Sequence, residues 1–447
     1  MNNEIIKTNN GFEVKKGQTM SKLAIKGGEK VRDYLFPSQN TMDEAEEKAL
    51  LRVLKTGRPS GYRANKGLHF FGGPEVKALE VEWSKEFSSH HYSIACNSAT
   101  SGLFIACAAI ELKEGDEVIV SPYSMTCSAT IPLWFKAIPV YADVEPDYFC
   151  VDPESIKQNI TPNTKAIIAV DIFGQPCNYA RIRAIIREAE NKYKKRIWLI
   201  TDTAQSPGAR FGAEFAGTIG DIGVFSFNFG KHMTCGEGGM IMTANLELSQ
   251  RCRLIMNHAE SVMNDYENDL SNEFFNDHCH MIGLNLRMTE FQAAVAREQL
   301  KKLSWNIQER RKNVALLNYL LSSIPAITAA QIRLDCTHTY YVAAYLWDSW
   351  EANGLHRDKF IEAVKAELSP REGRDGEGVQ IGCGYIKPIY MMPFNNDQTH
   401  SLHLPVVEDL WRNKLFLTLY HAPNSKEEDI RDVGNAFNKV WKYRSLL

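Results

Sequence analysis

Between residues 92 and 201, short apolar runs alternate with longer amphipathic segments, and this alternation restricts the fold more than any other feature. Strands of a parallel sheet are buried on both faces, so they read as continuous apolar runs separated by helical segments. The predicted strands are Tyr92–Cys96, Glu117–Ser121, Val140–Val144, Ala166–Ile172 and Ile197–Thr201. The predicted helices are Ser98–Leu112, Ser124–Phe135, Pro153–Asn159 and Tyr179–Tyr193.

Two more strands are predicted downstream, Ile222–Phe227 and Gly239–Thr243. We therefore predict an α/β fold, in which helices cover a mostly parallel seven-stranded sheet. After a long helix from Thr289 to about Leu317, shorter strands and helices alternate, which predicts a smaller C-terminal α+β domain. The predicted division is an N-terminal arm over residues 1–40, a large domain over 41–317 and a small domain over 318–447. The elements predicted in the small domain are strands Tyr340–Trp347 and Val379–Tyr385, and helices Arg357–Leu368, Val406–Phe416 and Lys426–Lys442.

The composition is that of an ordinary globular protein, 44% hydrophobic and 23% charged with a formal net charge of −3. The chain therefore has no excess of basic residues that would attract the phosphates of a nucleic acid. The ten cysteines include no Cys-x-x-Cys pair, which is typical of reduced thiols in the cytoplasm. Residues 1–30 have no apolar core of a signal peptide, and polar residues interrupt the apolar run Ser93–Ile110. We expect a cytoplasmic protein without a membrane or nucleic-acid partner.

Lys231 lies in the loop between the last two predicted strands, just before Gly236, Gly238 and Gly239. Glycines let the backbone approach a ligand closely, and a desolvated lysine loses its proton more easily and can attack a carbonyl. The alternative is a β-hairpin whose tip happens to carry a lysine. Ligands gather at the C-terminal ends of parallel strands, which favours a functional lysine. Other polar residues predicted at those ends are Asn97, Ser98, Ser121, Tyr123, Asp171, Asp202 and Gln205.

Pyridoxal phosphate (PLP) requires three groups that the chain supplies. Lys231 offers an amine, and Asp202 offers a carboxylate for the pyridine nitrogen. The segment 97–102 opens a helix and offers backbone N–H groups and hydroxyls for the phosphate. Competing motifs are less complete. No Gly-x-Gly-x-x-Gly follows a strand, and the Gly230-Lys231 pair lacks the first glycine and the Ser/Thr of a P-loop.

Nine motifs follow one another along most of the chain: Thr56–Arg58, Gly115–Val120, Thr161–Ile168, Phe173–Pro176, Thr201–Ala209, Gly220–Gly223, Phe225–Phe227, Gly236–Gly239 and Gly283–Glu290. In this order they resemble the PLP-dependent sugar aminotransferases of the DegT/StrS type. The resemblance implies fold type I, PLP as the cofactor and a transamination reaction (EC 2.6.1.-).

The resemblance also implies roles for single residues. Lys231 resembles the lysine that bonds to PLP and then moves the proton. Asp202 resembles the partner of the pyridine nitrogen, and Gln205 resembles the residue near the 3′-oxygen. The residues implied for the phosphate are Ala99, Thr100 and Ser226, together with Asn285 from the neighbouring subunit. The last role implies a homodimer with shared active sites.

Two positions depart from the family pattern. The phosphate loop reads Ser98-Ala99-Thr100 where the family usually has Ser-Gly-Thr, a change that a cup of backbone N–H groups tolerates. The aromatic residue that stacks on the pyridine ring is replaced by Met125, whose thioether can pack on the ring. Tyr123 is the alternative for this position.

Two other groups of residues allow a chemical interpretation. His278-Cys279-His280 could bind a metal, but no second pair of ligands matches it, so we predict loop chemistry and no metal. Arg58, Tyr62, Arg63 and Lys66 either bind substrate phosphates or solvate a loop.

The leading hypothesis is an aminotransferase that moves an amino group from L-glutamate or L-glutamine to a nucleotide-linked keto-sugar. The product would serve amino-sugar biosynthesis for a surface polysaccharide or a secondary metabolite. Thr218–Thr243 also resembles the ketocyclitol (scyllo-inosose) aminotransferases, so a ketocyclitol is the alternative acceptor. A PLP-dependent sugar dehydratase, whose family members carry histidine in place of the lysine, and a non-catalytic PLP-binding regulator are disfavoured by the intact Lys231, Asp202 and Gln205.

Overall fold

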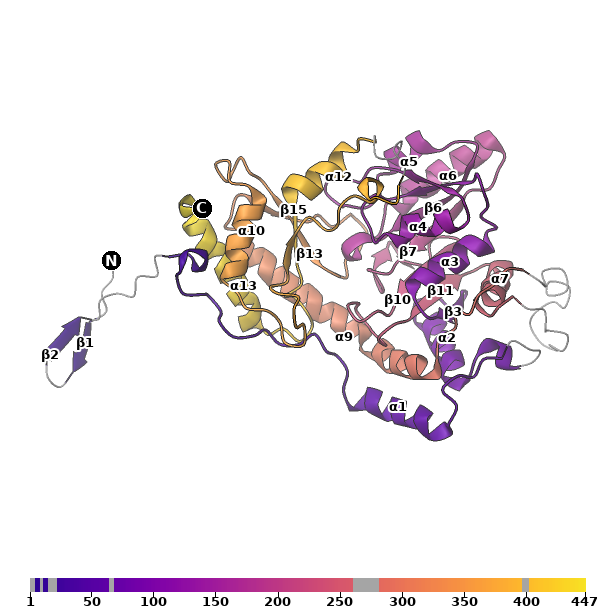
Figure 1. The fold of residues 1–447 in the computed structure, drawn as a ribbon, viewed down its shortest axis with the longest axis horizontal. Coiled ribbons are helices and arrows are strands. Elements are labelled where there is room, and N and C mark those ends of the chain that lie inside the picture. The colour runs from indigo at the N-terminus through magenta and orange to yellow at the C-terminus, as the bar shows by residue number, and fades with distance from the viewer. Residues whose placement is uncertain (1–4, 9–10, 15–21, 64–67, 260–280, 396–401) are drawn as a thin grey trace.

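The computed structural model describes residues 5–8, 11–14, 22–63, 68–259, 281–395 and 402–447. Its main feature is a seven-stranded sheet with the strand order β3-β11-β10-β7-β6-β4-β5 (Figure 1). The strands are β3 (Tyr92–Cys96), β4 (Glu117–Val120), β5 (Ile138–Tyr141), β6 (Thr164–Val170), β7 (Trp198–Asp202), β10 (Ile222–Ser226) and β11 (Gly239–Thr243). The predicted α/β fold class is confirmed.

Only β11 runs against the other strands of this sheet. It pairs antiparallel with both β3 and β10, whereas all the remaining pairs are parallel. The C-terminal ends of six strands therefore meet at one edge of the sheet. The helices that surround the sheet are α2 (Pro74–Phe87), α3 (Ala99–Ala109), α4 (Cys127–Trp134), α5 (Pro153–Asn159), α6 (Tyr179–Tyr193) and α7 (Leu246–Met256).

A second, four-stranded sheet lies beside the first, with the order β12-β13-β15-β14. Its strands are β12 (Ile327–Ala329), β13 (Ala343–Trp347), β14 (Ile381–Cys383) and β15 (Leu415–Thr418). Helices α10 (Arg357–Ala366), α12 (Pro405–Asp409) and α13 (Glu427–Lys442) accompany it. Two hairpins complete the strands, β1 (Ile5–Thr8) with β2 (Gly11–Val14), and β8 (Arg210–Phe211) with β9 (Glu214–Phe215).

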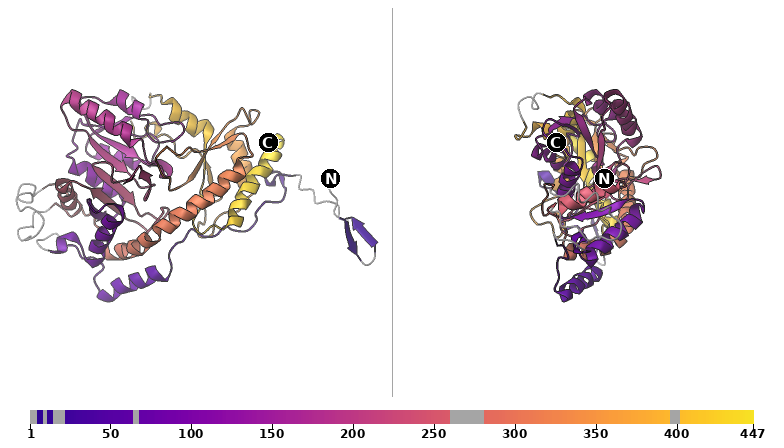
Figure 2. Two further views of the ribbon diagram at one scale, coloured as in Figure 1. Left: turned by 180° about the vertical axis from the view of Figure 1, so that it is seen from behind. Right: turned by 90° about the vertical axis from the view of Figure 1, so that its right-hand side faces the viewer.

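Helix α9 (Glu290–Leu321) joins the two regions and runs obliquely across the molecule (Figure 2). It starts at a capping box, in which the Thr289 hydroxyl accepts the Gln292 N–H and the Gln292 side chain accepts the Thr289 N–H. Its first half contributes Ala296 and Leu303 to the core around the large sheet. Its second half contributes Val314 and Leu317 to a separate core around the small sheet.

The N-terminal segment 22–40 lies against the second core. Leu23 and Phe36 are fully buried there, and the Phe36 N–H donates to the carbonyl of Pro370. Helix α1 (Glu44–Thr56) follows and packs against α9. The division at residues 40 and 317 stays a prediction, and these contacts show that segment 22–40 and the end of α9 share one core with the small sheet.

The predicted helix Val406–Phe416 is wrong only at its last two residues. Helix α12 ends at Asp409, a π-helical turn continues over Leu410–Lys414, and Leu415 begins β15. All four residues of β15 are buried between β13 and β14. Pairing on both sides therefore overrides the helical pattern of the sequence.

Two predicted strands are shorter than expected. The strand predicted from Tyr340 begins only at Ala343, because the N–H groups of Thr339 and Tyr341 donate to Gly174 and Phe173 of the large region. The strand predicted over Val379–Tyr385 is limited to β14. The residues just before β13 thus make their backbone hydrogen bonds toward the large sheet.

We predict that Gly102→Ala destabilises the protein by about 1–3 kcal/mol, because overpacking a tight core forces backbone or side-chain shifts. A Cβ at Gly102 in α3 would lie 2.7 Å from Val224 Cγ1 of β10. The free energy of unfolding in urea tests this. Gly382→Ala is the matched control, since its Cβ would meet no heavy atom within 4 Å. Equal stability of the two variants would contradict the prediction.

Candidate active site

A cavity of about 240 Å³ opens at the edge of the large sheet where the parallel strands end. Seven of the eight predicted site residues line it: Ala99, Thr100, Met125, Asp202, Gln205, Ser226 and Lys231. The other lining residues are Ser98, Leu103, Ser124, Cys127, Ala204, Asn228, Glu237 and Tyr341. Residues far apart in the sequence thus form one site, as expected for the C-terminal ends of parallel strands.

Lys231 lies in a turn that Asn228 holds in place. The Asn228 carbonyl accepts the Lys231 N–H at 2.9 Å, and the Asn228 side-chain oxygen accepts the Gly230 N–H at 3.2 Å. The Asn228 amide in turn donates to Glu237 at 2.9 Å. Lys231 Nζ lies 4.1 Å from the centre of the Tyr341 ring, a favourable position for a cation.

Asp202 lies at the end of β7 and is almost fully buried. Its Oδ1 accepts the Ala204 N–H at 3.2 Å, and its Oδ2 accepts the Ser128 hydroxyl at 3.1 Å. Burial raises the pKa of Asp202, while the Ala204 N–H, the charge of Lys231 and the Ser128 hydroxyl oppose this rise. A cation brought to this carboxylate would further favour its charged form.

The N-terminus of α3 forms one wall of the cavity. Ser98 is the N-cap, and its hydroxyl accepts the Ser101 N–H at 3.0 Å. The positive end of the helix dipole and the free N–H groups there favour an anion. Gly239 lies so close that a Cβ would be 2.6 Å from the Ser98 carbonyl carbon, so only glycine fits at this position.

Met125 and Tyr123 differ in their access to the cavity. Met125 lines it and is half exposed, whereas Tyr123 is fully buried. The Tyr123 hydroxyl is already engaged, because it accepts the Tyr385 N–H at 2.7 Å. This arrangement favours Met125 for the ring-stacking role, which stays a prediction.

Asn285 is the one predicted site residue outside the cavity lining. It forms an isolated backbone bridge with Asn257, and its side-chain oxygen accepts a hydrogen bond from Arg287 Nε at 2.8 Å. The Asn285 side-chain oxygen is therefore engaged by Arg287, and its predicted role at the phosphate of a neighbouring subunit stays a prediction.

Asp171 was expected among the polar residues of the site, but it does not line the cavity. It is fully buried, and its carboxyl group accepts hydrogen bonds from Tyr179 Oη at 2.6 Å, Cys177 N–H at 2.9 Å and Thr203 Oγ1 at 3.1 Å. Burial raises the pKa of Asp171 to about 7. Asp171 differs from the prediction because three donors inside the protein occupy its carboxyl group, which therefore does not reach the cavity.

Sequence reasoning missed three residues that complete the site, Ser128, Tyr341 and Tyr385. Ser128 lies within α4, and Tyr341 and Tyr385 come from the small region, so no motif at a strand end could identify them. His278-Cys279-His280 lies outside the described residues. Within the described ranges, no group of three or more metal-ligating side chains forms, and no helix is long and apolar enough to cross a membrane.

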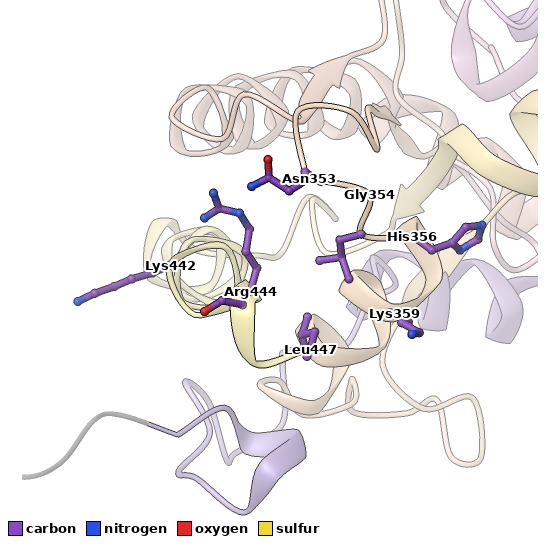
Figure 3. A pocket seen from close by; sticks show the side chains of 10 residues that line it. Asn353, Gly354, His356, Lys359, Lys442, Arg444 and Leu447 are labelled. Atoms are coloured by element: carbon purple, nitrogen blue, oxygen red, sulfur yellow. The ribbon is translucent and has the colours of Figure 1, made fainter.

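A larger cavity of about 490 Å³ lies in the small region, between α10 and the end of α13 (Figure 3). Basic residues surround it, but Lys442 points away, and the Arg444 guanidinium stacks on Trp441 at 3.8 Å from the ring centre. None of the residues singled out in the sequence lies there. The smaller cavity is therefore the candidate active site.

The fold and the cavity define a class of protein in which a lysine, a buried carboxylate and the N-terminus of a helix line one cavity at the C-terminal edge of a parallel sheet. Comparison with known proteins agrees, because residues 62–438 match the DegT/DnrJ/EryC1/StrS aminotransferase family. The chain belongs to this family, and the predicted resemblance is confirmed.

Three relatives illustrate the similarity. The chain is 30% identical to L-glutamine:2-deoxy-scyllo-inosose aminotransferase from Streptomyces kanamyceticus, over 96% of this chain and 98% of that protein. It is 26% identical to an aminotransferase from Psychrobacter cryohalolentis, with a TM-score of 0.77 over 91% of this chain and 99% of that one. It is 25% identical to DesI, whose structure was solved with its TDP-sugar product, with a TM-score of 0.77 over 95% and 97% of the two chains.

We predict that Asp171→Asn removes part of the pH dependence of stability. The folded state holds the Asp171 proton more tightly than the unfolded chain, so this stabilisation is present at low pH and is lost as the pH rises through about 7. Between pH 5 and pH 8, the free energy of unfolding of the wild type should fall by on the order of 2 kcal/mol more than that of the variant. Urea unfolding at both pH values tests this.

The matched control is Asp33→Asn, which removes an exposed carboxylate. It should follow the wild type at both pH values. If Asp171→Asn also follows the wild type, the carboxyl group is not held protonated in the folded protein.

Proposed function

We propose that this chain is a PLP-dependent aminotransferase that moves an amino group from L-glutamate or L-glutamine to a keto-sugar. The observation that carries the proposal is the convergence of Lys231, Asp202, Gln205 and the N-terminus of α3 on one cavity. Membership of an aminotransferase family supports the same reaction class.

The residues present fit PLP by their chemistry. The cavity offers an amine in Lys231 and a buried carboxylate in Asp202. The phosphate has the N–H groups of Ala99 and Thr100 and the Ser226 hydroxyl at its disposal. Gln205 provides an amide near the expected 3′-oxygen. When bound, PLP supplies an electron sink for the bonds that break at the substrate carbon.

Each of these residues has a separate task in the proposed reaction. Asp202 would pair as a carboxylate with a proton on the pyridine nitrogen, and its burial would strengthen this interaction. Lys231 Nζ would hold the cofactor and would carry a proton to and from the substrate carbon. The Tyr341 ring lies beside this amine, with its centre 4.1 Å from Nζ.

Two acceptor classes remain in the proposal. DesI was solved with a TDP-sugar product, which supports a nucleotide-linked keto-sugar as the leading acceptor. The Streptomyces kanamyceticus relative matches almost the whole of both chains and is named for a ketocyclitol, which supports this class as the second candidate.

We also propose a homodimer with shared active sites in the cytoplasm. The support for the dimer is the position of Asn285, which lies outside its own cavity. A sugar dehydratase and a non-catalytic regulator are less well supported, because the lysine and both of its partner side chains are in place.

We predict that Lys231→Ala lowers transamination by more than about 100-fold, the size expected for loss of a positioned proton carrier. The variant should also fail to develop the yellow absorbance of PLP bound through a lysine. The wild-type band should bleach when L-glutamate or L-glutamine is added, which identifies the donor. A yellow wild type that neither donor bleaches would contradict the proposed reaction but not PLP binding.

We predict that Lys231→Ala and Asn285→Ala complement each other in mixed dimers. Each pure variant is expected to have low activity, because one lacks the amine and the other lacks a phosphate ligand in both sites. Random mixing makes half of the dimers mixed, each with one intact site, so roughly a quarter of wild-type activity should return. Activity that stays at the level of the two pure variants would contradict shared sites.

A further inference from the structure

We propose that Tyr385 is a positioning residue that fixes the Gln205 amide so that its NH₂ group faces the cofactor. Tyr385 follows β14 of the small sheet, whereas Gln205 follows β7 of the large sheet. The inference rests on the proposed function, because the target of the amide is the 3′-oxygen of PLP.

The chemistry of one hydrogen bond determines which way the Gln205 amide points. The Phe173 backbone N–H is a donor, and it lies 2.8 Å from Gln205 Oε1. An amide turned the other way would bring its own N–H groups against this donor, and a buried donor left unpaired is costly. Phe173 lies in a tight turn with φ of 61°, so the direction of its N–H is set by the turn.

Tyr385 holds the opposite end of the same amide. Gln205 Nε2 donates to the Tyr385 hydroxyl at 3.1 Å. Burial raises the pKa of Tyr385, so the hydroxyl stays neutral over the working pH range. Nε2 carries two hydrogens, and among the described residues it has no second acceptor. Since Gln205 lines the cavity and is only 3% exposed, its remaining N–H can only serve a group inside the cavity.

Tyr385 is itself held by contacts with the large region. Its backbone N–H donates to the Tyr123 hydroxyl at 2.7 Å. Its ring packs edge-on against Tyr123 and Phe173, with ring centres 5.9 and 5.2 Å apart. Phe173 and Tyr385 therefore touch each other as well as Gln205, and the three residues form a closed set of contacts.

The path of the chain explains how a small-sheet residue reaches this place. After β14, Gly384 adopts a positive φ of 63°, and its N–H donates to the Leu415 carbonyl. A Cβ at Gly384 would lie 2.9 Å from Trp411, so the turn depends on glycine. The chain then crosses to the large region, where the Ile389 N–H donates to the Pro122 carbonyl. The amide of Gln205 is thus set jointly by both parts of the protein.

A donor aimed at the 3′-oxygen has a spectroscopic consequence. It stabilises the negative charge on that oxygen, and this favours loss of the neighbouring proton from the nitrogen bonded to the cofactor. A well-placed Gln205 therefore lowers the pH at which the yellow form loses this proton and its absorbance changes. Loss of the Tyr385 hydroxyl removes one of the two hydrogen bonds that hold the Gln205 amide, so the amide can tilt about the bond to Phe173, which weakens this effect.

The test is a pH titration of the absorbance of PLP-loaded protein. Tyr385→Phe keeps the ring and its packing but removes the hydroxyl. We expect the midpoint of the absorbance titration of this variant to rise by about 0.5 pH unit. A shift of this size corresponds to part of the free energy of one hydrogen bond. Gln205→Ala should raise the midpoint further. Tyr385→Phe should add nothing in the Gln205→Ala background, because Tyr385 acts through Gln205.

The matched control is Tyr390→Phe in the same segment. It removes a hydroxyl that donates to Glu408 at 2.8 Å and has no contact with Gln205, so its midpoint should equal that of the wild type. Circular dichroism of each variant tests whether it is folded.

Three results would overturn the inference. These are an unchanged midpoint in Tyr385→Phe, an equal shift in Tyr390→Phe, and a Tyr385→Phe shift that persists in full without Gln205. A wild-type protein that never becomes yellow would instead contradict the proposed function and, with it, this inference. The last result is distinct, because it appears before any variant is compared.

Discussion

The site depends on the common direction of six strands in the large sheet. Because β3, β4, β5, β6, β7 and β10 all end at one edge, the loops that follow them are forced to meet there. The single reversed strand, β11, is what returns the chain after Lys231 and lets Gly239 pass beside the α3 N-terminus. Cofactor phosphate, pyridine nitrogen and lysine positions in the proposal all follow from this geometry.

Burial and the number of hydrogen-bond donors determine what each carboxyl group near the site can do. Asp202 is removed from water, yet it accepts only two hydrogen bonds from the described residues, so its carboxylate remains available to a cation. Asp171, one strand away, has three donors around it and is satisfied by the protein itself. The two neighbouring carboxyl groups differ in role because one faces the cavity and the other faces the core.

Much of the large region could be predicted from the sequence, because its signals are local. Apolar runs identify the strands, and helix α6 and strand β11 have the predicted bounds. The small region was harder, since β15 is a strand only through its partners β13 and β14. The same limit applies to the site. Lys231 and Asp202 follow predicted strands. Tyr341 reaches the cavity, and Tyr385 reaches Gln205, through long-range contacts that no local pattern records.

Helix α9 carries a consequence for how the molecule unfolds. One face of its first half is part of the large core, and one face of its second half is part of the small core. Neither core can lose its packing without exposing apolar surface on the helix that the other core uses. The two regions are therefore expected to unfold together. A fragment that ended at Leu321 would keep Val314 and Leu317 but lose the core of the small sheet that covers them.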